Sequence, residues 1–315
     1  MKCLVTGATG FIGRALCARL EAMGAQYLAL STDGRALPDG HATVAVDFAS
    51  SGVPAELLEG VEIVFHLAGI AHQRAQAERY ELINHRATVE LAAACAAAGV
   101  CKFIFLSSVK AMGLPEDARA RTEEQYSLPS DAYGLGKRAA ELELLSAYDN
   151  SEMALLIVRP ALVYGSGVRG NLQTLATAVR NGVPRPPAMG GRSMIARTDL
   201  VELLIQVARQ NISGAHVWIA CDGQSYSACD IYDLMRAALG KAPGRRWLPV
   251  AVWRILCAMR DIYAKPSDGS TFDKIFATEL YDCSALTRDC GWQPSLQLAD
   301  EVDRIMGTGS DVDGY

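Results

Sequence analysis

Residues 4–13 read LVTGATGFIG, an apolar run that breaks into a glycine-rich turn. The run predicts a buried strand over 2–5, and the turn through Gly7, Gly10 and Gly13 leads into an amphipathic helix that ends near Gly24. Glycines let a pyrophosphate approach the helix N-terminus, where free N–H groups and the helix dipole favour negative charge. The spacing G-x-x-G-x-x-G departs from the commoner G-x-G-x-x-G. The stretch predicts a dinucleotide site; the alternative is a tight turn without a ligand.

The composition predicts a globular protein of one large or two modest domains. The chain has 315 residues, of which 50% are hydrophobic and 21% charged, and its net charge is −5. The absence of a basic stripe argues against nucleic acid as a partner. The nine cysteines include no C-x-x-C pair and indicate reduced thiols in a cytoplasm; with the nucleotide turn so near residue 1, no signal peptide is expected. The five histidines lack metal-ligand spacing, so no metal is expected.

One long apolar stretch, WLPVAVWRILCAMRDIY at 247–263, needs a separate interpretation. It is too short to span a bilayer and is interrupted by Arg254 and Arg260, so no transmembrane segment is expected. We expect a buried helix of the smaller domain. The alternative is a helix that lies on a membrane surface, which leaves peripheral membrane contact open.

Short apolar runs alternate with helical runs along the first half of the chain. Runs typical of strands occupy 27–30, 43–46, 63–67, 102–106 and 155–158, and helical composition occupies 92–98 and 137–145. This alternation predicts an α/β protein, a Rossmann-type doubly wound parallel sheet with a smaller, mostly helical C-terminal substrate lid. We expect a dinucleotide-binding domain over 1–165 with a return strand near 215–221, a lid over 166–214 and 222–306, and a flexible tail over 307–315.

Tyr133 and Lys137 stand four residues apart in SDAYGLGKRAAE, at 130–141. Ser130 or Asp131 can cap a helix there, which places Tyr133 and Lys137 on one helix face. A free phenol has a pKa near 10, and a nearby ammonium lowers that pKa. A tuned tyrosine can exchange a proton with a substrate hydroxyl while hydride moves to or from nicotinamide. The alternative is a surface Tyr–Lys pair.

Ser107 and Ser108 follow the predicted strand over 102–106. The carboxyl ends of parallel strands line the ligand crevice, so a serine there can hold the reacting oxygen near Tyr133. The alternative is a serine that satisfies the backbone at a strand end.

Taken together, these motifs resemble the extended short-chain dehydrogenases/reductases of the nucleotide-sugar epimerase/dehydratase family, in particular UDP-galactose 4-epimerases and a bacterial polysaccharide-biosynthesis branch. The resemblance covers nearly the whole chain. It rests on TGATGFIG at 6–13, HLAG at 66–69, Asn84, the serine pair, YGLGK at 133–137, RPALVYG at 159–165 and GWQP at 291–294.

The resemblance implies a catalytic set, a cofactor site and a substrate site. The catalytic residues would be Ser108, Tyr133 and Lys137. Of the two serines, Ser108 and not Ser107 would be the active-site serine. The cofactor would contact Gly7, Thr9, Gly10, Phe11, Ile12, Gly13, Ser31, Arg35, Asp47, Phe48, Leu67, Ala68, Gly69, Asn84, Ser107, Tyr133, Lys137 and Pro160.

The substrate-binding residues implied by the resemblance are Lys110, Asn171, Arg192 and Lys274. Asn171 and Arg192 match positions that hold the substrate diphosphate, and a guanidinium can grip phosphate through two hydrogen bonds. Otherwise Asn171 caps a helix and Arg192 is a solvated loop residue. Lys110 lies in SSVKAMG at 107–113, a motif similar to one in bacterial polysaccharide enzymes. Lys274 is the nearest cation to the place where many relatives have a second phosphate-binding arginine.

Two departures from the family pattern bear on the chemistry. Ser108 is followed by Val109 and Lys110 instead of the acidic pair of dehydratases, so dehydration is disfavoured. At the end of the second strand Ser31 replaces the usual acidic residue of NAD enzymes, and Arg35 could reach a 2′-phosphate. The pattern favours NADP(H) over NAD(H), with Asp33 as the residue that would still serve an NAD ribose.

The expected activity is NAD(P)-dependent hydride transfer at C4 of a nucleotide-linked hexose, most simply a UDP-sugar, by a cytoplasmic 4-epimerase or 4-keto-sugar reductase. One alternative is a dehydrogenase or reductase of a non-sugar carbonyl compound. Another is a non-catalytic Rossmann protein that senses NADP(H). A homodimer and a lipid-linked substrate both stay open.

Overall fold

The centre of the protein is a seven-stranded, wholly parallel sheet. The structure is a computed structural model and describes residues 2–50, 52–71, 76–168, 170–245, 248–264 and 270–308. The strand order is β10-β6-β5-β4-β1-β2-β3. The strands are β1 (Lys2–Thr6), β2 (Gln26–Ser31), β3 (Val44–Ala45), β4 (Ile63–His66), β5 (Lys102–Leu106), β6 (Ala154–Pro160) and β10 (Ala215–Ala220). The order reverses between β1 and β4, and ligands of such sheets bind in the crevice at that point.

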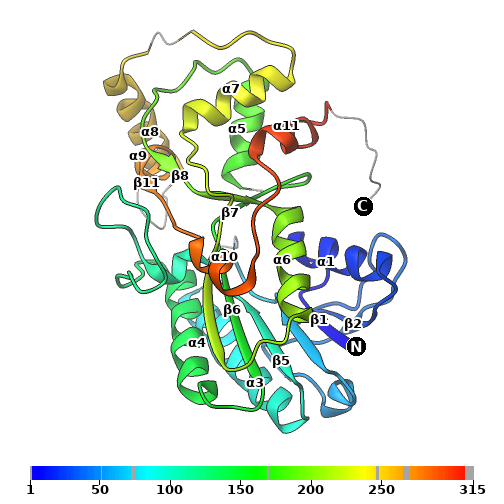
Figure 1. Cartoon of the computed structure of the whole chain (residues 1–315). Helices are drawn as coiled ribbons and strands as arrows, with labels where there is room; N and C mark the ends of the chain where they lie inside the picture. The colour runs from blue at the N-terminus through cyan, green and yellow to red at the C-terminus, as the bar shows by residue number, and fades with distance from the viewer. Residues whose placement is uncertain are drawn as a thin grey trace.

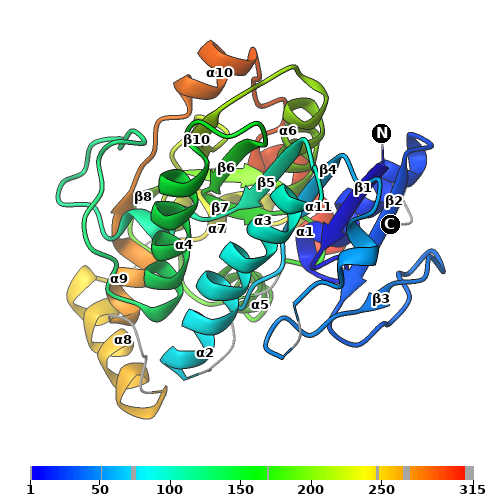
Figure 2. The same ribbon diagram turned by 90° about the horizontal axis from the view of Figure 1, so that it is seen from below.

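Helices cover both faces of the sheet (Figures 1 and 2). On one face lie α1 (Phe11–Ala22) and α6 (Arg197–Arg209), and on the other α3 (Ala87–Ala97) and α4 (Ala132–Tyr148). Side chains alternate along each strand, so Cys3 and Val5 pack with α1 whereas Leu4 packs with α3 and α4. Burial on both faces explains why the strands read as continuous apolar runs.

Short helical segments connect these elements. They are a 3₁₀ turn at Ala55–Leu58, α2 (Ala77–Glu81), a π-helical turn at Leu82–Arg86 and a 3₁₀ turn at Val109–Met112. The π-helical turn carries Asn84, and the 3₁₀ turn at Val109–Met112 follows Ser108 directly. Both segments therefore bear on the candidate site.

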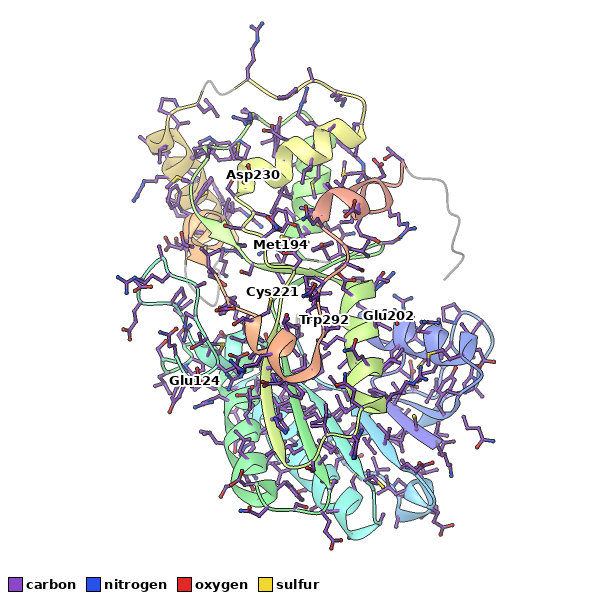
Figure 3. All side chains as sticks on the ribbon, viewed as in Figure 1. Glu124, Met194, Glu202, Cys221, Asp230 and Trp292 are labelled. Carbon is purple, nitrogen blue, oxygen red and sulfur yellow. The ribbon has the colours of Figure 1, made fainter. Side chains whose placement is uncertain are left out.

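The lid stands above this edge and has its own core. It is built from α5 (Asn171–Arg180), α7 (Ala228–Ala238), α8 (Val250–Ala264), α9 (Thr271–Phe276) and α11 (Leu298–Met306), with the strand pairs β7 (Leu162–Tyr164) with β9 (Met194–Ala196) and β8 (Gly191–Arg192) with β11 (Thr278–Glu279). Figure 3 places Met194 and Cys221 at the junction between the sheet and this helical layer.

Two helices expected in the lid pack on the sheet instead. α6 lies within the expected lid range 166–214, and α10 (Ser284–Cys290) within 222–306. Leu200 and Leu204 of α6 and Leu286 of α10 join the core that contains β1 and α1. Of the expected tail over 307–315, only Gly307 and Thr308 lie within the described residues.

The expectation of a buried helix over 247–263 is wrong. The stretch does form α8, but Ile262 is 73% exposed and Tyr263 86% exposed. Only one side of α8 packs, against α9, because the remainder of the lid does not extend over it. Trp247 lies outside the described residues. In the described ranges no helix is long and apolar enough to cross a membrane.

Candidate active site

The glycine turn after β1 is fitted closely to the segment after β4. Gly7 has φ +67° and its carbonyl accepts a hydrogen bond from the Gly10 N–H at 2.9 Å. A Cβ on Gly13 would lie 2.2 Å from the Gly7 oxygen, and one on Gly7 would lie 2.8 Å from the Ala68 nitrogen. Side chains are therefore excluded at both positions, and the chain enters α1 in a compact turn.

The N-terminus of α1 is suited to an anion. Among the described residues no side chain caps this end, and the first turn of α1 contains no acidic residue. Unsatisfied N–H groups and the positive end of the helix dipole favour a phosphate at this point. These residues fit the pyrophosphate of a dinucleotide, with Thr9, Phe11 and Ile12 only partly buried around it.

At the end of β2, the cation expected to bind a 2′-phosphate is already paired with a carboxylate. Ser31 is buried, and its hydroxyl bonds to the Thr43 hydroxyl at 2.7 Å and accepts the Gly34 N–H at 2.9 Å. Arg35 donates to Asp33 Oδ2 at 2.6 and 3.0 Å, and this hydrogen bond lowers the pKa of the Asp33 carboxyl. A 2′-phosphate would have to compete with this carboxylate for the guanidinium.

Buried polar groups hold the loop after β4. His66 lies between the Thr6 hydroxyl (2.9 Å) and the Thr88 hydroxyl (3.0 Å). Burial, and secondarily the charge of Lys137, lowers the pKa of His66 to about 3, so the ring is neutral at physiological pH. The Phe48 ring lies edge-on to His66 at 5.8 Å between centroids. Asp47 is exposed, with Oδ1 accepting the Ala49 N–H at 3.0 Å.

Asn84 fixes the backbone that follows Leu67, Ala68 and Gly69. Its side chain accepts the Ile70 N–H at 2.8 Å and donates to the Ile70 carbonyl at 2.9 Å. A Cβ on Gly69 would lie 2.9 Å from Asn84 Oδ1 and 3.4 Å from Lys137 Nζ. Gly69 and Asn84, which are expected to contact the cofactor, therefore lie close to Lys137, the lysine expected to be catalytic. The Asn84 side chain thus holds the backbone of the loop that is expected to contact the cofactor.

The residues expected to be catalytic lie where α4 begins, next to the end of β5. Asp131, rather than Ser130, caps α4, since its Oδ1 accepts the Gly134 N–H at 2.8 Å. The Ser108 side chain lies next to the Tyr133 phenol and acts to lower its pKa. Lys137 Nζ donates to the Leu106 carbonyl at 2.9 Å and lies 4.5 Å from the centre of the Phe105 ring.

The structure corrects the expected effect of Lys137 on Tyr133. Desolvation raises the pKa of Tyr133 to about 12, with Asp131 and Glu141 adding to the rise and the hydrogen bond from Ser108 opposing it. Desolvation also lowers the pKa of Lys137 to about 7. A lysine that is only partly charged, and that donates to a backbone carbonyl, does not tune the phenol in the protein alone.

Ser107 has a different environment from Ser108. It is buried, and its hydroxyl donates to Glu141 Oε1 at 2.5 Å. Glu141 in turn accepts hydrogen bonds from Arg159 at 2.9 and 2.8 Å. Sequence reasoning missed Glu141 and Arg159. The available signal was an acidic residue one turn after Lys137, on the helix face that also carries Tyr133.

Two of the residues expected to bind substrate, Arg192 and Lys274, lie next to each other. Arg192 Nη2 donates to the Lys274 carbonyl at 2.6 Å and lies 3.5 Å from Glu279 Oε1. The arginine is thus a partly buried lid residue, not a solvated one. Asn171 is exposed at the first position of α5, where Gly170 is the N-cap residue. Lys110 is half-buried and its N–H donates to the Ser108 hydroxyl at 3.2 Å.

Arg197 is a third residue that sequence reasoning missed. Its guanidinium stacks on Phe11 at 4.8 Å and donates to the Ser166 carbonyl at 3.0 Å. Burial lowers its pKa. It lies beside Gly165 at the edge of the glycine turn, where a cation can face a bound anion. Pro160 ends β6 beside Ala220 of β10.

The described residues include no group of three or more His, Cys, Asp or Glu side chains that could hold a metal ion.

Comparison with known proteins identifies the family and several relatives of the chain. Residues 3–220 match the NAD dependent epimerase/dehydratase family. The chain is 30% identical to the UDP-glucose 4-epimerase of Vibrio cholerae, over 94% of this chain and 91% of that protein. It is 28% identical to the 2-alkyl-3-oxoalkanoate reductase of Shewanella oneidensis, over 96% of this chain and 84% of that protein. The solved structure of MoeE5 in complex with UDP-glucose and NAD superposes with a TM-score of 0.78 at 24% identity, covering 98% of both chains.

The fold, the family match and the full-length relative thus define an extended short-chain dehydrogenase/reductase. The chain belongs to the NAD dependent epimerase/dehydratase family.

Proposed function

We propose that the protein transfers hydride at C4 of a UDP-linked hexose, as a 4-epimerase or a 4-keto-sugar reductase in cell-surface polysaccharide biosynthesis. The observation that carries this proposal is that the Ser108 side chain lies next to the Tyr133 phenol and lowers its pKa, one turn from Lys137 and at the sheet edge where α1 begins. The V. cholerae relative, named a UDP-glucose 4-epimerase, supports the substrate class. UDP-sugars and nicotinamide dinucleotides are used in the cytoplasm, where we place the enzyme.

Each of the three side chains has a role that follows from its position. Tyr133 takes or gives the proton of the C4 oxygen, and Ser108 holds that oxygen against the phenol. Lys137 is placed to turn from the Leu106 carbonyl toward the nicotinamide ribose. The oxidised nicotinamide, when bound, accepts hydride and adds a positive charge beside the phenol, which lowers the pKa of Tyr133 from its value in the protein alone.

The choice of NAD or NADP rests on the end of β2. We retain the preference for NADP(H), because Ser31 does not repel a 2′-phosphate and Arg35 is exposed next to it. The Asp33–Arg35 pair is the feature that opposes this preference. The sugar diphosphate would be held by Arg192 and Asn171, with Lys110 and Lys274 nearby along the substrate path.

A second candidate function is the reduction of a non-sugar ketone. The near full-length match to a 2-alkyl-3-oxoalkanoate reductase favours it. The two candidates differ in the need for a diphosphate site, since an oxoalkanoate carries only a carboxylate.

One experiment separates these functions. The purified protein is denatured, and any released cofactor is identified by mass. The native protein is then given UDP-glucose without added cofactor, and separately a UDP-4-keto-sugar or a 2-alkyl-3-oxoalkanoate with NADPH. Retained NAD with formation of UDP-galactose indicates an epimerase, and consumption of NADPH with only the keto-sugar indicates a 4-ketoreductase. Turnover of the oxoalkanoate alone would replace the proposal by the second candidate. Cofactor binding without any turnover would favour a sensor.

A further inference from the structure

The outward face of α8 is apolar, which is unusual for a helix at the edge of a protein. Five of the twelve large hydrophobic side chains exposed in the described residues lie on this one helix. They are Ile255 (59% exposed), Leu256 (47%), Met259 (51%), Ile262 (73%) and Tyr263 (86%). We call these five residues the α8 face.

The α8 face is continuous. At 100° per residue, the five side chains fall within a sector of about 120° around the helix axis. Arg260 lies beyond one edge of that sector, and Arg254 lies beyond the other, where its guanidinium is 4.6 Å from the centre of the Phe272 ring of α9; both arginines are exposed. Arginines can extend their apolar stems along such a face while their charged ends reach polar surroundings.

The other side of α8 is packed and does not compete for these residues. Trp253 lies edge-on to Phe276 of α9 at 6.0 Å between ring centroids, and Cys257 is 5% exposed. Asp261 accepts hydrogen bonds from the N–H and hydroxyl groups of Thr271. The acidic residue of the helix is therefore directed to α9, away from the α8 face.

The segment that contains α8 is strongly basic although the chain is acidic. Residues 241–265 contain Lys241, Arg245, Arg246, Arg254, Arg260 and Lys265, with Asp261 as the single acidic residue, whereas the whole chain carries a net charge of −5. Lys241 and Arg245 are exposed, like Arg254 and Arg260. This charge is complementary to an anionic surface.

We propose that the α8 face docks the protein on an anionic lipid bilayer. The apolar side chains would enter the boundary between headgroups and acyl chains, and Arg260 would contact lipid phosphates. The helix has 15 residues, about 22 Å in length, so it lies on the bilayer instead of crossing it. In Figures 1 and 2 α8 lies at the edge of the molecule, where a flat surface can reach it.

A second copy of the chain fits this face less well. In a two-fold contact the same patch meets itself, so Arg254 and Arg260 would approach their counterparts, with like charges at the rim. Five side chains on one helix are also few compared with the roughly 20–30 residues per partner of a stable protein interface.

The test is flotation of the purified full-length protein with phosphatidylcholine vesicles and with vesicles that also contain phosphatidylglycerol. We expect the protein to float with the anionic vesicles and to be released by salt. Ile262→Glu and, separately, Ile255→Glu should each lower the partition coefficient at least about tenfold, because a charge replaces an apolar side chain in the lipid boundary. Arg260→Gln should weaken binding to anionic vesicles only.

Val44→Glu is the matched control. Val44 is 38% exposed on β3, which lies across the molecule from α8 in Figure 2, so binding should be unchanged. Because the substituted side chains are exposed, the thermal unfolding of all variants should match that of the wild type. The proposal is overturned if the wild type does not float, or if Ile262→Glu floats as well as the wild type. It is equally overturned if, without lipid, the wild type is a dimer that Ile262→Glu converts to monomers.

Discussion

Glu141 and Arg159 form a two-point ion pair with N–O distances of 2.9 and 2.8 Å, and the Ser107 hydroxyl donates to the same carboxylate. Both partners of the ion pair are almost fully buried. Removal of one partner leaves the other charge buried without compensation, so Glu141→Ala should lower the free energy of unfolding by about 3–5 kcal/mol. The control Glu143→Ala removes an exposed carboxylate from the same helix and should cost at most about 1 kcal/mol. Denaturant unfolding of both variants measures the difference, and equal costs would contradict the buried charge pair.

The proposed proton transfer predicts a specific kinetic effect of Tyr133→Phe. Turnover should fall by about 10²–10⁴-fold, as is typical when a general acid–base group is lost, while cofactor affinity changes little. Tyr126→Phe removes a phenolic hydroxyl from an exposed ring and should leave turnover unchanged. Steady-state rates and cofactor titrations of the two variants make the test. Near-normal turnover of Tyr133→Phe would remove the catalytic role.

Burial of Lys137 predicts how stability depends on pH in the cofactor-free protein. Its pKa falls from 10.5 to about 7 on folding, so between these values the unfolded state binds more protons than the folded state. The free energy of unfolding therefore gains about 1.4 kcal/mol per pH unit from this group across that interval and nothing below it. The variant Lys137→Met lacks the titrating group. The stability of the wild type minus that of Lys137→Met should rise from neutral pH to about pH 10, and a flat difference would show that the lysine is not desolvated.

The fold was predictable because the apolar runs, the turn residues and the helix caps of the sequence all indicate the same architecture. Apolar runs, a glycine turn and helical segments in alternation specify a parallel sheet, and Asp131 lies where a helix cap was expected. The residues of the candidate site could be proposed from the sequence, but the electrostatics among them could not. Whether Lys137 lowers the pKa of Tyr133 depends on desolvation and on the direction of the ammonium, which no spacing reveals.

The helices α6 and α10, which were expected in the lid, and the exposed helix α8 show a second limit of prediction from the sequence. An amphipathic helix such as α6 has an apolar face, but the sequence does not say whether that face meets the lid or α1. In the same way, the apolar character of α8 says nothing about whether protein covers it. Partners distant in the chain decide both questions.

Cofactor preference should respond to the residues at the end of β2. Asp33→Asn removes the carboxylate that holds Arg35, so the guanidinium becomes available and the ratio of NADP(H) to NAD(H) affinity should rise. Ser31→Asp should lower the same ratio, because a carboxylate bonds a ribose 2′-hydroxyl and repels a 2′-phosphate. Titration of both cofactors against the three proteins measures the ratio. If neither substitution changes it, the discriminating contacts lie elsewhere.

Arg192 should bind the substrate diphosphate independently of the sugar. It is a half-buried guanidinium in the lid, oriented by the Lys274 carbonyl at 2.6 Å and by Glu279. A phosphate can accept charge-assisted hydrogen bonds from it, so Arg192→Ala should weaken binding of free UDP by about tenfold or more, with about 1.5–3 kcal/mol expected for a hydrogen bond to a charged group. Cofactor affinity should be spared, because the dinucleotide pyrophosphate is expected at the Gly7–Gly13 turn.

Arg180→Ala is the matched control for this last test. Arg180 is also a lid arginine that donates to a backbone carbonyl, that of Met306 at 2.7 Å, but it is not among the residues expected at the diphosphate. Calorimetry with UDP should therefore give wild-type affinity for Arg180→Ala and weakened affinity for Arg192→Ala. If the wild type binds UDP and Arg192→Ala binds it equally well, Arg192 has no part in the diphosphate site. If the wild type does not bind UDP at all, the substrate carries another nucleotide, a lipid diphosphate or no diphosphate, and the oxoalkanoate candidate gains support.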